Sequence, residues 1–141
     1  MLKPGGHMNM SYLSETICQK QVTIIYTGPT IIRMLCDYFL LVNNDVDSIS
    51  RIKTLRNILL AGELSKPKHL STLGKYLYPS TNVYILYGAS EFLISIINNI
   101  KNIHDLRNST TVIPLGRPLI NYEVFILNDK MQPVEKDEIG E

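Results

Sequence analysis

The sequence predicts an α/β protein in which a partial parallel sheet with flanking helices is followed by a small β-hairpin region. Short apolar segments rich in β-branched residues alternate with longer segments whose apolar residues recur at helical spacing. Only a few residues separate neighbouring segments, which favours parallel strands joined by right-handed crossovers. After residue 100 the alternation ends. We therefore expect a partial α/β subdomain over residues 1–113 and the start of a β subdomain over residues 114–141.

The first half of the chain predicts two helices with a strand between them. Residues 1–9 indicate a loop, and residues 10–20 place apolar side chains on one face of a helix. The segment 22–26 is nearly all apolar, as a strand covered on both faces would be. Gly28 and Pro29 open a second helix that extends to about residue 41, because proline is tolerated at the first helical position. The polar residues 43–53 then indicate a surface loop or a short helix.

Two further strands and one helix follow. Residues 57–61 form a short apolar strand, and Ser65 can cap a third helix that has Pro67 in its first turn. A proline at position 79 ends this helix, and residues 82–86 form the third strand.

The remainder of the chain has a different pattern. Residues 101–111 are polar, and residues 114–118 are rich in turn formers. Alternating side chains over 122–127 and a turn at 128–130 predict a strand or hairpin of a second sheet.

Composition excludes several classes of protein. The 14 basic and 13 acidic residues leave no basic stripe for nucleic acid and no polybasic patch for a membrane. No apolar stretch is long enough to cross a bilayer, and the N-terminus lacks the apolar centre of a signal peptide, so we expect a cytoplasmic protein. Cys18 and Cys36 lack metal-ligand spacing and are expected to be reduced and buried.

Each predicted strand runs into a glycine within a residue or two. These glycines are Gly28, Gly62 and Gly88, and Glu63 and Glu91 follow two of them. Ligands of open parallel sheets bind at the carboxyl ends of the strands, where glycine lets the backbone approach a ligand closely. The pattern indicates a ligand site, although ordinary strand-to-helix turns with solvated glutamates would look the same.

The segment Tyr87-Gly88-Ala89-Ser90-Glu91 resembles the aromatic-Gly-x-Thr-Glu motif of the adenylate-forming (AMP-binding) enzyme superfamily, with serine in place of threonine. Residues 59–63 resemble the family's upstream Gly-Glu turn, and residues 114–121 its downstream Gly-Arg-Pro segment. Residues 124–129 and 139–141 resemble the stretch that enters its next motif. The resemblance covers essentially the whole chain and is nearest to the amino-acid adenylation domains of nonribosomal peptide synthetases.

The resemblance implies part of the large N-terminal domain of such an enzyme, with ATP or AMP and Mg²⁺ as cofactors of the intact protein. Tyr87 would stack on adenine, Ser90 would contact the α-phosphate and Glu91 would hold Mg²⁺ through oxygen ligands. The implied nucleotide-binding residues are Gly62, Glu63, Tyr87, Gly88 and Ser90.

The resemblance also implies a substrate pocket and partners. The pocket positions are Tyr26, Leu59, Ala61, Leu86, Ile94 and Ser95. All but Ser95 are apolar or aromatic, which would favour a small carboxylate with a hydrophobic side chain, such as a hydrophobic amino acid. Leu59, Leu86 and Ile94 could equally be plain core. The downstream acceptor would be a phosphopantetheine-bearing carrier domain of the parent protein.

Several groups that the family uses are not found in this sequence. They are the Ser/Thr/Gly-rich phosphate loop, the ribose-binding aspartate of the Thr-Gly-Asp run and the C-terminal catalytic lysine; the aspartate for the substrate amine would lie before residue 1. We therefore expect a fragment that is inactive alone. Three alternatives stay open: a fragment of an acyl-CoA or aryl-CoA ligase, a non-catalytic nucleotide-binding remnant, and an unrelated mononucleotide-binding α/β domain.

Overall fold

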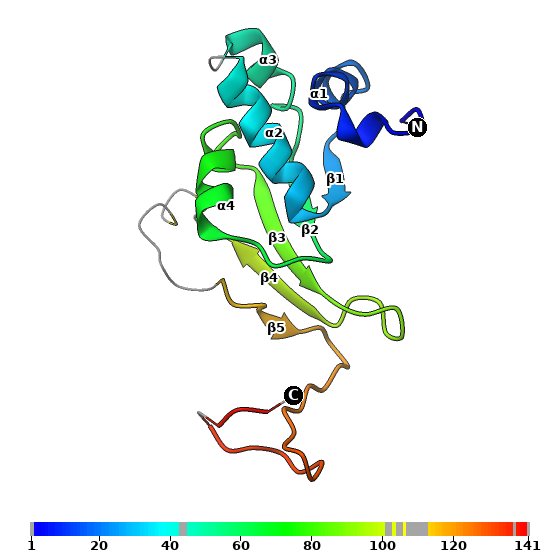
Figure 1. The fold of residues 1–141 in the computed structure, drawn as a ribbon, viewed down its shortest axis with the longest axis vertical. Coiled ribbons are helices and arrows are strands. Elements are labelled where there is room, and N and C mark those ends of the chain that lie inside the picture. The colour runs from blue at the N-terminus through cyan, green and yellow to red at the C-terminus, as the bar shows by residue number, and fades with distance from the viewer. Residues whose placement is uncertain are drawn as a thin grey trace.

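The computed structural model describes residues 2–42, 45–100, 103, 106, 113–136 and 138–140. Helices and strands alternate over most of these residues (Figure 1). The elements are η1 (Gly6–Met8), α1 (Met10–Gln19), β1 (Ile24–Thr27), α2 (Pro29–Leu41), α3 (Val46–Ser50), β2 (Asn57–Leu60), α4 (Pro67–Gly74), β3 (Asn82–Tyr87), β4 (Ile96–Ile100) and β5 (Arg117–Pro118). In the described part of the chain, no helix is long and apolar enough to cross a membrane.

The five strands form one sheet in the order β1-β2-β3-β4-β5. The first three strands are parallel, with Tyr26 opposite Leu59 and Leu59 opposite Tyr84. β4 and β5 are antiparallel to their neighbours. The predicted α/β class with a partial parallel sheet is confirmed, and β1, β2 and β3 all end at the same edge.

The core lies between the helices and one face of the sheet. α2 and α4 lie over the same face in Figure 1. Ile58 and Val83 from the strands and Phe39 and Leu73 from the helices are fully buried in one apolar cluster. Phe39 packs its ring 4.9 Å from that of Tyr76, measured between centroids.

The opposite face of the sheet is open at β1. Successive strand residues point to opposite faces, and Ile24 and Tyr26 are 59% and 63% exposed whereas Ile25 packs on the core. The expectation that residues 22–26 are covered on both faces is therefore wrong. An apolar sequence cannot show which face a neighbouring element covers.

Two local expectations also differ from the structure. Residues 96–100 form the antiparallel strand β4, which the sequence did not predict because Asn98 and Asn99 interrupt its apolar pattern. Helix α4 takes Lys66 as its N-cap, with no side-chain cap hydrogen bond, so the predicted capping role of Ser65 is wrong. Ser65 is buried instead.

The C-terminal segment extends from the sheet edge (Figure 1). Its described part contains one antiparallel bridge, between Leu127 and Pro133, around a turn at the predicted position 128–130. The predicted strand over 122–127 otherwise has no regular secondary structure and no ladder. Most of the polar segment 101–111 lies outside the described residues, and the predicted boundary after residue 113 stays a prediction.

Candidate functional site

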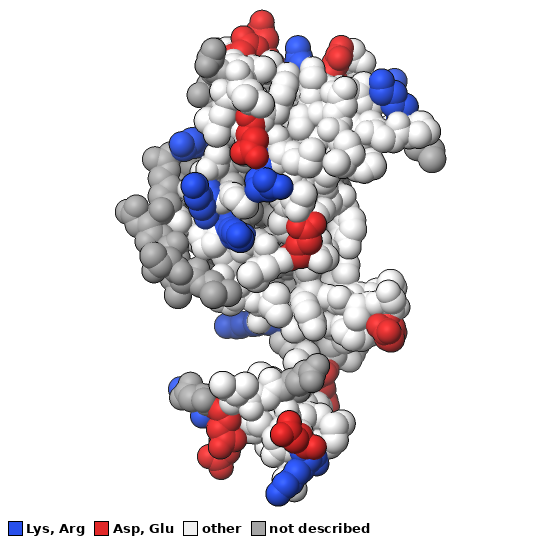
Figure 2. All heavy atoms as spheres, in the orientation of Figure 1, with Lys and Arg blue, Asp and Glu red and all other residues white. Residues whose placement is uncertain are grey.

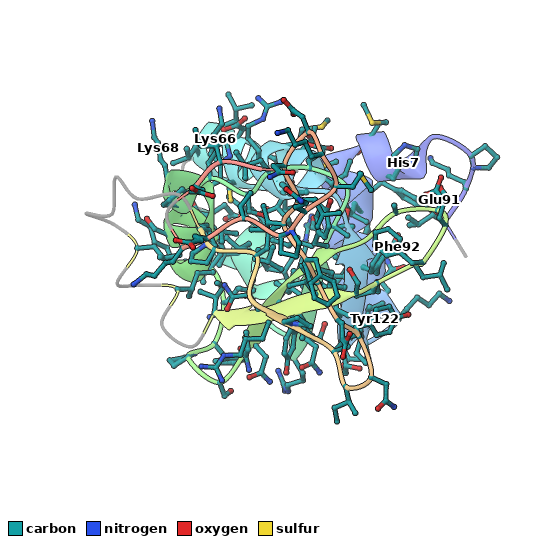
Figure 3. All side chains as sticks on the ribbon, turned by 90° about the horizontal axis from the view of Figure 1, so that it is seen from below. His7, Lys66, Lys68, Glu91, Phe92 and Tyr122 are labelled. Carbon is teal, nitrogen blue, oxygen red and sulfur yellow. The ribbon has the colours of Figure 1, made fainter. Side chains whose placement is uncertain are left out.

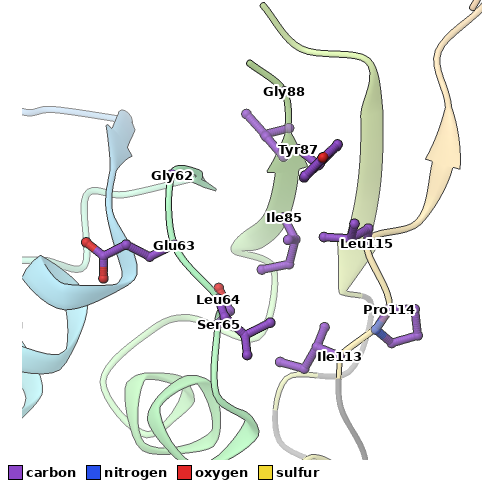
Figure 4. A pocket seen from close by; sticks show the side chains of 11 residues that line it. Gly62, Glu63, Leu64, Ser65, Ile85, Tyr87, Gly88, Ile113, Pro114 and Leu115 are labelled. Atoms are coloured by element: carbon purple, nitrogen blue, oxygen red, sulfur yellow. The ribbon is translucent and has the colours of Figure 1, made fainter. Parts of the chain in front are cut away.

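A pocket of about 590 Å³ opens at the carboxyl edge of the parallel strands (Figure 4). This volume is within the range of roughly 300–1,000 Å³ that is typical of small-molecule sites. Its wall comes from three segments: the turn after β2, the end of β3, and the stretch that leads into β5. The lining residues are Gly62, Glu63, Leu64, Ser65, Ile85, Leu86, Tyr87, Gly88, Ile113, Pro114 and Leu115.

The turn after β2 brings backbone to the pocket. Gly62 has a φ of +85°, in the left-handed region that favours glycine, and a Cβ on it would meet nothing within 4 Å. The backbone at this position is therefore open to an approaching ligand. The next residue, Glu63, is tied to α2, because Thr30 in the first turn of that helix donates its hydroxyl to the Glu63 carboxylate. Glu63 thus links the turn after β2 to the start of α2.

Tyr87 is the last residue of β3 and stands at the same edge as Gly62. Its side chain is 46% exposed, so it is neither a core aromatic nor a fully solvated one. Leu86, immediately before it, is buried but does not belong to the main core cluster. An aromatic ring at the rim and an apolar floor fit a flat, largely apolar ligand.

Gly88 begins a loop that folds back on the end of β3. A Cβ on Gly88 would stand 1.4 Å from the carbonyl oxygen of Leu93, so the close approach requires glycine. The backbone N–H of Ser95 donates to the carbonyl of Tyr87 at 2.9 Å and closes the loop. Leu93 adopts a φ of +56°, which is uncommon for a branched side chain.

Ser90 and Glu91 lie in the turn of this loop and are exposed. Figure 3 shows Glu91 with Phe92 at the tip of the loop, far from Lys66 and Lys68 at the start of α4. Neither Ser90 nor Glu91 lines the pocket as described. No group of three or more His, Cys, Asp or Glu side chains that could hold a metal occurs among the described residues. Glu91 thus offers a single carboxylate, and its assignment to Mg²⁺ stays a prediction.

The predicted substrate positions lie on the open side of the same sheet edge. Tyr26, Leu59 and Leu86 are each the penultimate residue of their strand, and the register together with the strand alternation directs them to one face. Ala61 follows β2. Ile94 and buried Ser95 lead from the loop into β4. The structure thus brings the strand-borne positions together, but only Leu86 also lines the 590 Å³ pocket.

A second, more polar cavity of about 380 Å³ adjoins the first on the helical side. Arg33, Lys66 and His69 line it together with Glu63, and Figure 2 shows basic side chains gathered on this helical face. Burial lowers the pKa of His69, and the neighbouring positive charge of Lys66 lowers it further. His69 is therefore more readily neutral than an exposed histidine.

Sequence reasoning missed part of the pocket wall. The sequence predicts Ser65 as a helix cap, Pro114 and Leu115 as the start of the Gly-Arg-Pro segment, and Ile113 only as the end of the first subdomain, whereas all four line the pocket. The resemblance of residues 114–121 to the family's Gly-Arg-Pro segment was the signal available. It did not predict that this segment lines a pocket together with the end of β3.

The fold is similar to that of solved N-terminal subdomains of adenylate-forming enzymes. The N-terminal subdomain of Klebsiella oxytoca NpsA, solved in complex with 3-hydroxybenzoyl-AMSN, matches 92% of this chain with a TM-score of 0.67 and 20% sequence identity. The match covers 30% of that structure.

The chain belongs to the AMP-binding enzyme family, whose model matches residues 1–141. It is 31% identical over 142 residues to the nonribosomal peptide synthetase acrB of Aspergillus aculeatus, covering 100% of this chain and 9% of that protein. It is 25% identical over 143 residues to zwittermicin A synthase ZmaJ of Bacillus cereus, covering 100% of this chain and 26% of the relative. The chain thus corresponds to part of an adenylate-forming domain and spans 9% and 26% of the length of these two relatives.

Proposed function

We propose that this chain forms the adenine-nucleotide-binding part of an amino-acid adenylation domain. The observation that carries the proposal is that Gly62, Leu86 and Tyr87 line one pocket at the carboxyl edge of a parallel sheet. The first comes from the turn after β2 and the other two from the end of β3. Adenine would lie between the Tyr87 ring and the open backbone of Gly62, where aromatic stacking contributes about 1–3 kcal/mol.

The charged part of the nucleotide would extend toward the loop after β3. Ser90 would donate its hydroxyl to the α-phosphate, and Glu91 would bind Mg²⁺, a hard cation that prefers oxygen ligands and is shared with phosphate oxygens. The exposure of both side chains supports these roles, because phosphates and a hydrated ion need a solvent-facing site. Glu63 would contribute less directly, since its carboxylate already accepts the hydroxyl of Thr30.

In the intact enzyme the substrate carboxylate would attack the α-phosphorus of ATP and release pyrophosphate. The acceptor of the activated acyl group would be a phosphopantetheine thiol on a carrier domain. The apolar positions Tyr26, Leu59 and Leu86, which share one face of the sheet, support a hydrophobic amino acid as substrate. Ala61, Ile94 and Ser95 would complete that pocket. The chain by itself would bind nucleotide without completing the reaction.

The test is equilibrium binding of AMP to the wild-type chain and to Tyr87→Ala. Loss of stacking should weaken binding about tenfold or more, since 1.4 kcal/mol corresponds to a factor of ten. Tyr78→Ala is a matched control, because Tyr78 is also 46% exposed but lies outside the pocket. Equal AMP affinity for Tyr87→Ala and Tyr78→Ala, or no AMP binding by the wild type, would contradict the proposal.

A further inference from the structure

The wall of the 590 Å³ pocket is poor in polar side chains. Among its lining residues, only Glu63, Ser65 and Tyr87 carry one. The Glu63 carboxylate already accepts a hydrogen bond from Thr30, and Tyr87 would present its ring face to a base. The remaining side chains are aliphatic or absent. A ligand with a polar edge therefore has one uncommitted side-chain partner in this wall, which is Ser65.

Ser65 is in an unusual state for a buried serine. Its side chain is 4% exposed, and its hydroxyl has no hydrogen-bond partner within the part of the chain that the structure describes. It does not cap α4, because Lys66 occupies the N-cap position. Buried hydroxyls in native proteins nearly always have a hydrogen-bond partner. An unpartnered hydroxyl in a pocket wall therefore indicates that a polar group of a bound ligand is its partner.

We propose that Ser65 is a specificity-determining residue whose hydroxyl hydrogen-bonds the polar edge of the adenine base, an inference that rests on the proposed function. Ser65 lies three residues beyond Gly62, on the turn that would support the base from the side opposite Tyr87. Its hydroxyl is enclosed, and rotation about the Cα–Cβ bond between staggered positions would direct it toward the pocket. Serine can accept from an amino group or donate to a ring nitrogen, so both kinds of polar atom on the adenine edge are suitable partners.

The experiment measures binding of AMP and of purine riboside monophosphate, which lacks only the amino group, to the wild-type chain, Ser65→Ala and Ser65→Thr. We expect Ser65→Ala to weaken AMP binding about 3- to 10-fold, as the loss of one hydrogen bond predicts. Ser65→Thr keeps the hydroxyl and should retain most of the affinity. A loss confined to AMP assigns the contact to the amino group, and an equal loss for both ligands assigns it to a ring nitrogen.

Ser14→Ala is the matched control. Ser14 is also fully buried, but its hydroxyl donates to the carbonyl of Ser11 at 2.9 Å and it does not line the pocket. This variant should bind AMP like the wild type. Unchanged AMP affinity in Ser65→Ala, with AMP still bound by the wild type, would overturn the role of Ser65 and leave the proposed function standing. A Ser65→Thr variant that binds AMP as weakly as Ser65→Ala would also overturn the role of Ser65. Absence of AMP binding by the wild type would overturn both.

Discussion

Cys36 lies on the buried side of α2 and is 3% exposed. Burial and, to a smaller extent, the neighbouring carboxylate of Asp37 together raise the pKa of its thiol to about 12. Cys18 is only half-buried. Since the thiolate is the reactive form, the two cysteines should differ in reactivity despite both being free.

We expect Ellman's reagent to modify Cys18 quickly and Cys36 only at the rate of unfolding, measured on the Cys36→Ser and Cys18→Ser variants. The raised folded-state pKa also means that the contribution of Cys36 to stability is complete below about pH 9 and is lost as the pH rises toward about 12. Equal reaction rates for the two thiols in the folded protein would contradict this account.

At the scale of residues, the site could be predicted where glycines and an aromatic side chain follow strands directly. Gly62 and Tyr87 were found this way, and both line the pocket. Ser65 was not, because a serine just before a helical pattern is a preferred helix N-cap, whereas here the helix begins one residue later than a Ser65 cap requires. Ile113 could not be found either, since the pocket that it lines with the end of β3 is formed by segments far apart in the sequence.

The loop between β3 and β4 depends on one close backbone approach. At Gly88 a Cβ would overlap the carbonyl of Leu93. We expect Gly88→Ala to displace this loop, lower the thermal midpoint and weaken AMP binding. Gly5→Ala is the control: its φ is +70°, but a Cβ there meets nothing within 4 Å, so the substitution introduces backbone strain alone, at a residue that does not line the pocket. A Gly88→Ala variant as stable as Gly5→Ala, with full AMP affinity, would contradict the described loop.

Among the elements, the helices α1 and α2 were predictable from apolar residues at helical spacing, and the three parallel strands from short apolar runs bounded by turn residues. β4 was not, because Asn98 and Asn99 dilute a short apolar run and nothing local specifies an antiparallel partner. Sheet order, register and the covered face of each strand are decided by contacts between distant segments. That is why β1 was predicted as a strand but with the wrong burial.

At the scale of the whole molecule, apolar side chains are left uncovered on the sheet and along the C-terminal segment. Ile24 and Tyr26 are mostly exposed on β1, and Ile120 and Ile139 are 89% and 98% exposed. Exposed apolar patches and an unpaired β1 edge favour association between copies.

We expect the purified chain to self-associate in light scattering coupled to size-exclusion chromatography, with mass rising with concentration. Tyr26→Lys should shift the distribution toward monomer, because it places a charge on the open face. Lys20→Arg, a charge-conserving change at the exposed C-cap of α1, should leave the distribution unchanged. A wild-type monomer at every concentration would mean that these surfaces do not associate.

The central claim is that the pocket between Gly62 and Tyr87 holds adenine. Photolabelling with 8-azido-AMP, followed by peptide mapping with mass spectrometry, tests it most directly, because it reports position even if the chain associates. The account predicts labelling within residues 61–65 or 84–88, suppressed by excess AMP and reduced in Tyr87→Ala. Labelling concentrated elsewhere in the chain, or labelling that AMP does not suppress, would contradict it.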